Sequence, residues 1–163
     1  MNMYKNLMRV TISGLVVCLL GCGYKERRYE SLSHVNSEGD LSIASALSIP
    51  EDAVSISFRS DAESGHYFAS YDTKRSADYI QERRLLAASA RQDKSIRSSI
   101  GLGVVLPQSA SLYYRCSSSS KYHDEPNFGS DEISLLGVAG RKVYQWNKIH
   151  DQKLTGELCR NDR

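Results

Sequence analysis

The sequence predicts an α+β fold, a small antiparallel sheet of about five strands with one main helix packed on a face. Two patterns predict it: apolar residues recur at every second position in several short segments and at helical spacing in one longer segment. One pair of expected strands precedes the helix and three more follow it, at residues 54–58, 67–71, 112–116, 133–138 and 143–149.

The first two strands are expected to form a hairpin. Val54, Ile56 and Phe58 alternate with polar residues, and the alternation resumes over 67–71 after the turn-forming segment 60–65. This spacing favours an antiparallel pair whose loop is slightly longer than the tightest turns. A second hairpin is expected near the end of the chain, where residues 139–141 can turn it.

The helix is expected over residues 73–91. Its apolar positions form one stripe, its charges lie mostly on the other side, and Thr73 or Ser76 can cap it. Residues 92–99 are polar, and the two glycines within 100–106 favour a loop or a short irregular strand there.

The N-terminal segment has the form of an export signal. Residues 1–9 are polar and basic, residues 10–20 are apolar, and Gly21 and Cys22 follow. The apolar stretch is shorter than the roughly 20 residues of a transmembrane helix, and this arrangement is typical of a secretory signal peptide. An ordinary secretory signal with a chance cysteine, or a short buried helix, is the alternative.

The segment Leu19-Leu20-Gly21-Cys22 resembles the bacterial lipobox, although Leu20 is a less usual residue at its place. The resemblance implies that residues 1–21 are removed and that Cys22 carries a diacylglycerol and an acylated amine. Gly23, where inner-membrane lipoproteins often carry an aspartate, suggests the outer membrane, facing the periplasm. Several acyl chains on one cysteine would make release from the membrane negligible, since each buried methylene contributes about 0.8 kcal/mol.

Composition divides the rest of the chain into a tether and one domain. Residues 23–48 are polar and of mixed charge, so we expect 22–48 to be a lipidated tether that is mostly flexible. A short helix is an option near its end, where Leu41, Ile43, Ala44 and Leu47 recur. The Arg27-Arg28 pair within it is expected to be solvated, with contact to anionic headgroups as the alternative. Pro50 disfavours helix at the residue before it, and we place a single domain over 49–163.

The charge of the mature chain argues against nucleic acid as a partner. Lys and Arg number 21 and Asp and Glu number 19, and Lys5 and Arg9 leave with the signal segment. The mature chain is then formally neutral, whereas nucleic-acid and polybasic membrane contacts need a basic face.

Two cysteines, Cys116 and Cys159, remain after Cys18 is removed and Cys22 is lipidated. In an oxidising compartment an even number can pair. The bridge would close a loop of about 44 residues, worth roughly 4 kcal/mol in the chain-entropy model. Two free thiols are the alternative, and the absence of CxxC spacing speaks against a redox role.

No pattern in the sequence indicates catalysis, a metal or a cofactor. The histidines form no HExxH arrangement and no GxSxG elbow occurs. His123, followed by Asp124 and Glu125, is the nearest approach to an acid–base or metal cluster, and in a serine-rich loop we expect it to be solvated. We therefore expect a protein without catalytic residues, metal or cofactor.

Aromatic residues are unusually frequent on the expected strands. The chain has ten tyrosines and one tryptophan. Such side chains are common at binding surfaces, but they are also ordinary strand residues. Those on or beside strands are Tyr67, Tyr71, Tyr113, Tyr114, Tyr122, Tyr144 and Trp146.

Residues 49–58, the strand HYFASYD that follows, a helix opening near Ser76 and the strand over 142–146 together have a familiar form. This pattern resembles the small head domain of YbbD-like enterobacterial lipoproteins, and the resemblance covers about residues 47–149. It implies an α+β domain on a lipid anchor and no catalytic residues.

These observations favour a non-enzymatic envelope lipoprotein whose small domain binds a protein partner in the periplasm. Immunity against a toxin and exclusion of a phage are two forms of such a role. A structural or stress-related lipoprotein that contacts envelope components such as peptidoglycan is the first alternative. A small periplasmic hydrolase that uses the His123 loop is the second.

The lipid anchor is directly testable. We expect cells grown with labelled palmitate to incorporate the label into this chain and to hold it in the membrane fraction, because acylation of Cys22 attaches it there. A Cys22→Ser variant should lose both label and membrane retention. If the native chain takes up no label, or if the Cys22→Ser form behaves identically, the prediction of a lipid anchor at Cys22 is wrong.

Overall fold

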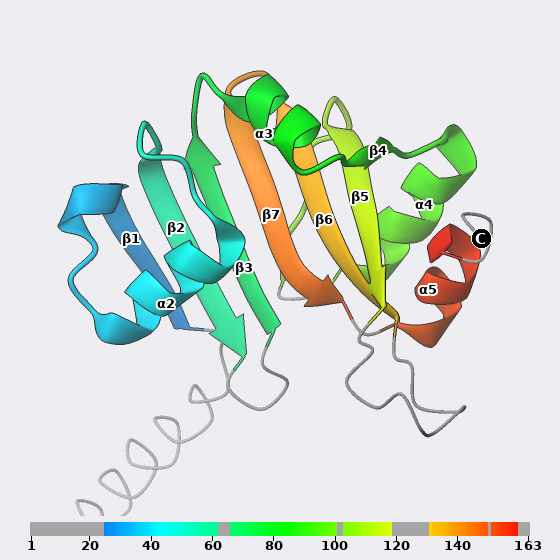
Figure 1. The fold of residues 1–163 in the computed structure, drawn as a ribbon, viewed down its shortest axis with the longest axis horizontal. Helices are drawn as coiled ribbons and strands as arrows, with labels where there is room; N and C mark the ends of the chain where they lie inside the picture. Colours follow the sequence, from blue (N-terminus) through cyan, green and yellow to red (C-terminus); the bar gives the residue numbers. More distant parts are fainter. Residues whose placement is uncertain (1–24, 62–65, 101–102, 119–130, 150, 160–163) are drawn as a thin grey trace, which may run out of the picture.

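The structure, a computed structural model, describes residues 25–61, 66–100, 103–118, 131–149 and 151–159. These residues form one antiparallel sheet in the order β1-β2-β3-β7-β6-β5-β4, with helices on both faces (Figure 1). The α+β class is therefore confirmed. Within the described residues the sheet has seven strands rather than about five, and four α-helices accompany it rather than one.

The elements follow one another along the chain as β1 (Lys25–Ser31), the 3-10 turn η2 (Leu32–His34), α2 (Glu38–Leu47), β2 (Val54–Asp61), β3 (His66–Asp72), α3 (Ser76–Glu82), β4 (Leu86–Ala87), α4 (Ala90–Ser99), β5 (Ser111–Ser118), β6 (Asp131–Ala139), β7 (Lys142–Ile149) and α5 (Gln152–Cys159).

Both expected hairpins are present. Strand β2 pairs with β3, and β6 pairs with β7, in antiparallel register. The two hairpins join through β3 and β7, so that Phe68 lies opposite Trp146 at the centre of the sheet. Successive side chains of a strand point to opposite faces, and the sheet therefore buries two separate cores.

The two cores lie on opposite faces of the sheet and are covered by different helices. On the first face, α2 and α3 cover a cluster that includes Ile56, Phe58 and Tyr71. On the second face, α4 and α5 cover a cluster that includes Leu135 and Trp146, beside β5 and β6. Each of these strands contributes side chains to both cores, because its successive residues point to opposite faces of the sheet.

The predicted disulfide between Cys116 and Cys159 is confirmed. The bond joins β5 to the last residue of α5, with the two Cα atoms 5.8 Å apart. It fastens α5 onto the second face, where Leu154 and Leu158 are buried. The sequence had not indicated this last helix.

The predicted helix over 73–91 is wrong in its second half. Arg84 takes the left-handed conformation with φ 52°, and the N–H of Leu85 donates to the carbonyl oxygen of Ile80, 3.0 Å away. This closes α3 as a Schellman motif does. The chain then forms β4, and α4 begins directly after its N-cap residue Ser89. The apolar stripe continues across the break, so the hydrophobic pattern concealed it.

Helix α4 lies in the segment that the sequence showed only as polar. Ser89 and Gln92 form a capping box, in which each side chain accepts the other's backbone N–H. Ile96 is fully buried in the second core. Ile96 is the only large apolar residue among the ten of α4, which is too sparse a signal for the helical period to show.

The predicted flexible tether over 22–48 is wrong from Lys25 onward, although the short helix considered near its end is present as α2. Residues of β1 pair with β2 along its length, and α2 packs on the first face. Arg27 and Tyr29 of β1 both contact the buried carboxylate of Asp40 on α2, the first as an ion pair and the second through an O–H donor 2.6 Å away. The segment is therefore part of the domain.

We expect Asp40→Ala to lower the free energy of unfolding by about 3–5 kcal/mol, because Arg27 then loses its buried partner. Urea denaturation followed by circular dichroism measures the change. Glu38→Ala, an exposed acidic position on the same helix, is the matched control and should change stability little. The paired replacement Arg27→Met with Asp40→Leu should recover most of the loss, and an Asp40→Ala protein of native stability would contradict the argument.

Candidate functional site

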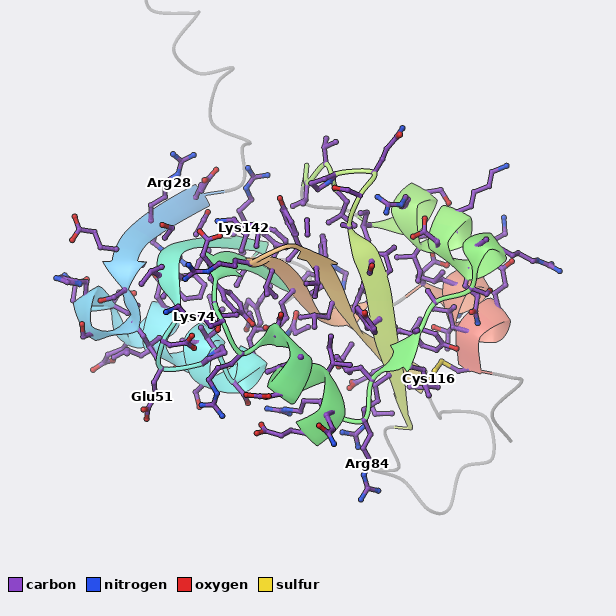
Figure 2. The ribbon with its side chains drawn as sticks, turned by 90° about the horizontal axis from the view of Figure 1, so that it is seen from above. Arg28, Glu51, Lys74, Arg84, Cys116 and Lys142 are labelled. Atoms are coloured by element: carbon purple, nitrogen blue, oxygen red, sulfur yellow. A yellow bond between two sulfur atoms is a disulfide. The ribbon has the colours of Figure 1, made fainter. Side chains whose placement is uncertain are left out.

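The second face of the sheet is covered over only half its width. Helices α4 and α5 lie against β5 and β6 there, and the described residues place no helix over β1, β2 and β3 on that side (Figure 1). The uncovered part is hollowed into a groove of about 430 Å³, which we call the sheet groove. In Figure 2, Arg28 points to this side, whereas Glu51, Lys74 and Arg84 lie on the side that carries α2 and α3.

The period of the strands decides which side chains line the sheet groove. On β2, Ile56 and Phe58 enter the first core, so Ser55, Ser57 and Arg59 face the groove. Other strands and the loop after α4 complete it. Its lining comprises Glu26, Arg28, Tyr29, Ser55, Ile56, Ser57, Arg59, Phe68, Ser70, Gly103, Val104, Val105, Lys142 and Tyr144.

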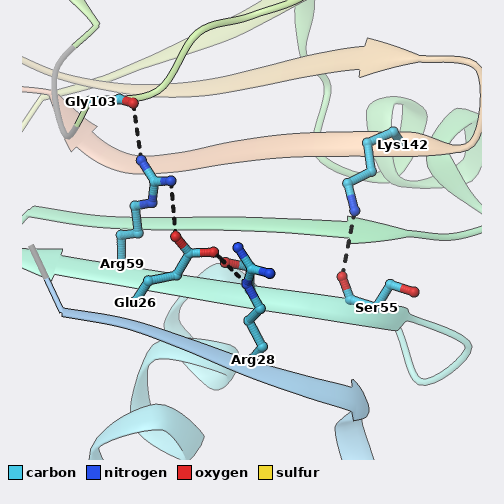
Figure 3. Close-up of polar contacts among 7 residues, drawn as sticks. Glu26, Arg28, Ser55, Arg59, Gly103 and Lys142 are labelled. Carbon is cyan, nitrogen blue, oxygen red and sulfur yellow. Dashed lines mark hydrogen bonds and ion pairs between the residues drawn. The ribbon is translucent and has the colours of Figure 1, made fainter.

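One end of the groove is organised around Glu26. Its two carboxylate oxygens accept from Arg28 Nε at 2.7 Å and from Arg59 at 3.0 Å, and Ser57 Oγ donates at 3.0 Å (Figure 3). The bond from Arg28 first, then those from Ser57 and Arg59, lower the pKa of the Glu26 carboxyl to about 2 against a smaller opposing effect of burial. Glu26 is therefore ionised at neutral pH and orients two cations.

The same end is closed by the loop that follows α4. Arg59 donates through its second guanidinium nitrogen to the carbonyl oxygen of Gly103, at 3.0 Å (Figure 3). Gly103 has a φ of 62°, which a side chain would strain. Beyond it, Val105 is 90% exposed on the rim of the groove. An apolar side chain is thus displayed next to a cationic one.

The other end of the groove carries Lys142. Its Nζ lies 3.4 Å from a carboxylate oxygen of Asp72. It also lies 3.5 Å from the carbonyl oxygen of Ser55 (Figure 3). Ser55 sits at a shift in the β2–β3 register and has a φ of 53°. At this shift in register the carbonyl oxygen of Ser55 faces Lys142.

The sheet groove has a cationic side chain that can bind a negatively charged ligand. The cations Arg28, Arg59 and Lys142 line the groove and contact two carboxylates, Glu26 in the lining and Asp72 beside it, so one positive charge is in excess. Arg28 is 80% exposed, and within the described residues its contact is through Nε alone, so both terminal nitrogens can donate elsewhere. Arginine in this state suits a carboxylate or phosphate group.

Serine hydroxyls lie between the two cationic ends, and that of Ser57 already donates to Glu26. Ser57 and Ser70 lie opposite each other on β2 and β3, and both line the groove. Arg59 pairs with Phe68 of β3, and Lys142 pairs with Asp72 of the same strand. These two positions are four residues apart, which is about 13 Å along β3. A ligand that spans the groove would therefore meet cations at both ends and hydroxyls between them.

The sites predicted from the sequence lie elsewhere. Gly21, Cys22 and the loop with His123 fall outside the described residues, and the Cys116–Cys159 bridge is structural. The Arg27-Arg28 pair, expected to be solvated as one unit, is divided: Arg27 binds Asp40 on the first face and Arg28 enters the groove on the second. The alternation of Ser55, Ser57 and Arg59 with apolar residues on β2 was the signal in the sequence, but it indicated only a half-buried strand.

The tyrosines do not form one aromatic face. Tyr71, Tyr114 and Trp146 are buried in the cores, and the first of these lies on a different face from the other two. Tyr67 and Tyr113 pack at the edge of the first core. Tyr144 is the aromatic residue among those expected on strands that lines the sheet groove, and Tyr122 lies outside the described residues.

Catalytic chemistry finds little support in the part of the chain that the structure describes. No group of three or more His, Cys, Asp or Glu side chains there could hold a metal ion. Ser31 Oγ lies 2.8 Å from His34 Nδ1, but both are exposed and three residues apart in a local turn. A catalytic serine also needs an oriented base and an oxyanion site, which this turn does not supply.

Comparison with known proteins found no match to the chain among protein-family models, curated proteins or solved structures. Among the described helices, none combines the length and the hydropathy that a membrane crossing requires.

We expect Glu26→Gln to flatten the pH dependence of stability in acid. The carboxyl has its pKa near 2 in the folded chain and near 4.5 in the unfolded chain. Its contribution is therefore complete above about pH 5 and is lost as the pH falls toward 2. Urea denaturation at pH 6 and pH 3 should show a larger drop for the native chain than for the variant. Equal losses of stability would contradict the conclusion that Arg28, Ser57 and Arg59 stabilise the ionised carboxylate of Glu26.

Proposed function

We propose that this protein is an exported lipoprotein, anchored through Cys22, whose domain binds an acidic protein partner in the cell envelope through the sheet groove. The observation that carries the proposal is the excess of cations over carboxylates in that groove, with Arg28 open to solvent. The role is one of binding, without catalysis. Immunity against a toxin or exclusion of a phage are forms that it can take.

Export is supported by the disulfide. Bridges persist in oxidising compartments and are rare in the cytosol. The Cys116–Cys159 bond joins β5, next to the far edge of the sheet, to the end of the described chain. Together with the signal-like segment before Cys22, it supports a periplasmic address, with the outer membrane favoured by Gly23.

An acidic partner is supported by the geometry of the cations. Arg28 rises from β1 at the edge of the sheet and Lys142 from β7 at its centre, and their side chains are 80% and 31% exposed. Complementary charge across an interface mainly sets specificity and the rate of encounter. The flanking Val105 adds an exposed apolar contact on the rim, and interfaces combine such a contact with a polar rim.

We expect charge reversal in the groove to abolish binding. With the photo-crosslinking residue p-benzoylphenylalanine in place of Ser70 on the groove floor, the native chain should give one discrete protein product in intact cells. Adding Arg28→Glu and Lys142→Glu should reduce that product at least tenfold, which corresponds to about 1.4 kcal/mol.

The matched control combines Lys74→Glu with Arg84→Glu, two exposed cations on the opposite side of the sheet (Figure 2); it should leave the product unchanged. A crosslinker at Ser42, exposed on α2, should give no such product. Equal losses in the groove and control variants would show a dependence on net charge alone. Sedimentation with purified sacculi that depends on Arg28 and Lys142 would point to the structural alternative instead.

A further inference from the structure

The folded domain begins almost at the lipidated cysteine. Strand β1 starts at Lys25, three residues after Cys22. A chain spans at most about 3.6 Å per residue, so Lys25 can lie no farther than about 11 Å from Cys22. This bound holds for any conformation of the residues between them.

Strand β1 is fixed in the sheet and does not lengthen the segment that joins Cys22 to the domain. Its residues pair with β2 from Lys25 to Ser31, and Arg27 and Tyr29 are fastened to the buried Asp40. Detaching the strand would leave that carboxylate without either partner, a cost of several kcal/mol. The anchor therefore acts on the rigid sheet itself.

The same strand builds the sheet groove. Glu26 and Arg28 line it and organise its cationic end. Arg28 is six residues from Cys22, and its Cα can therefore be at most about 22 Å from the lipidated residue. Wherever the domain tilts, this end of the groove stays close to the headgroups.

We infer that the partner of the sheet groove is a membrane-seated protein, which presents acidic side chains within about 25 Å of the lipid headgroups. The inference rests on the proposed function, because it takes Cys22 as the anchor and the groove as the binding surface. It adds where the partner resides and at what height its acidic surface lies.

The short link is an advantage for such a partner and a hindrance for a soluble one. Confinement of both proteins to one membrane raises their effective concentration without any new contact. A free globular protein would instead have to enter the narrow space between the groove and the membrane. A flexible tether over 22–48 would have allowed a reach of about 90 Å, but residues 25–48 are folded and pack in the domain.

The test varies the height of the domain above the membrane. A rigid spacer of six Glu-Ala-Ala-Ala-Lys repeats between Gly23 and Tyr24 would lift the domain by about 45 Å. A Gly/Ser spacer of the same length lets the domain return to the surface. Both are expressed as full chains with the crosslinker at Ser70, and palmitate label and disulfide formation verify export and folding of each.

We expect the rigid spacer to reduce the groove product more than tenfold and the flexible spacer to reduce it less than threefold. A rigid-spacer product as strong as the native one overturns the inference, because a soluble partner then suffices. Equal losses with both spacers also overturn it, since height would not be the cause. A crosslinked product with the mass of a lipid also overturns the inference, because the groove would then contact the headgroups rather than a protein. If the native chain takes up no palmitate or gives no groove product, the proposed function fails first.

Discussion

The carboxylate of Asp40 is the interaction on which the N-terminal half of this structure depends. It is fully buried, and Arg27 and Tyr29 reach it from β1 across the first face. A buried charge is tolerated only when it is paired and hydrogen-bonded, so the strand and the helix α2 must form together. Their union converts a highly charged segment into the edge of a sheet.

That edge creates the candidate site. Because β1 alternates, the strand that sends Arg27 and Tyr29 to Asp40 sends Glu26 and Arg28 to the other face. Stability and binding capacity thus come from the same strand through opposite sides. At the far edge the arrangement differs: the bond between Cys116 and Cys159 holds α5 over the second core, and the face is closed there rather than open.

This asymmetry explains why one half of the second face is available to a partner. Helices α4 and α5 bury Ile96, Leu154 and Leu158 over β5 and β6, whereas serines and cations occupy the corresponding positions of β1 and β2. A helix would gain little by packing there, because it would have to desolvate charged side chains. Under the proposed lipidation of Cys22, the three-residue separation between Cys22 and Lys25 would keep this half near the anchor.

The sequence by itself determined the α+β class, both hairpins and the pairing of Cys116 with Cys159, because these depend on local alternation and on a count of cysteines. Only the tertiary structure decided that β1 and α2 belong to the domain and that the helix after Ser76 breaks at Arg84. It also decided that serines and arginines of three separate strands meet in one groove. The physical reason is that a charged strand and a left-handed residue carry no hydrophobic period, and their conformations are favourable only when distant partners such as Asp40 are in place.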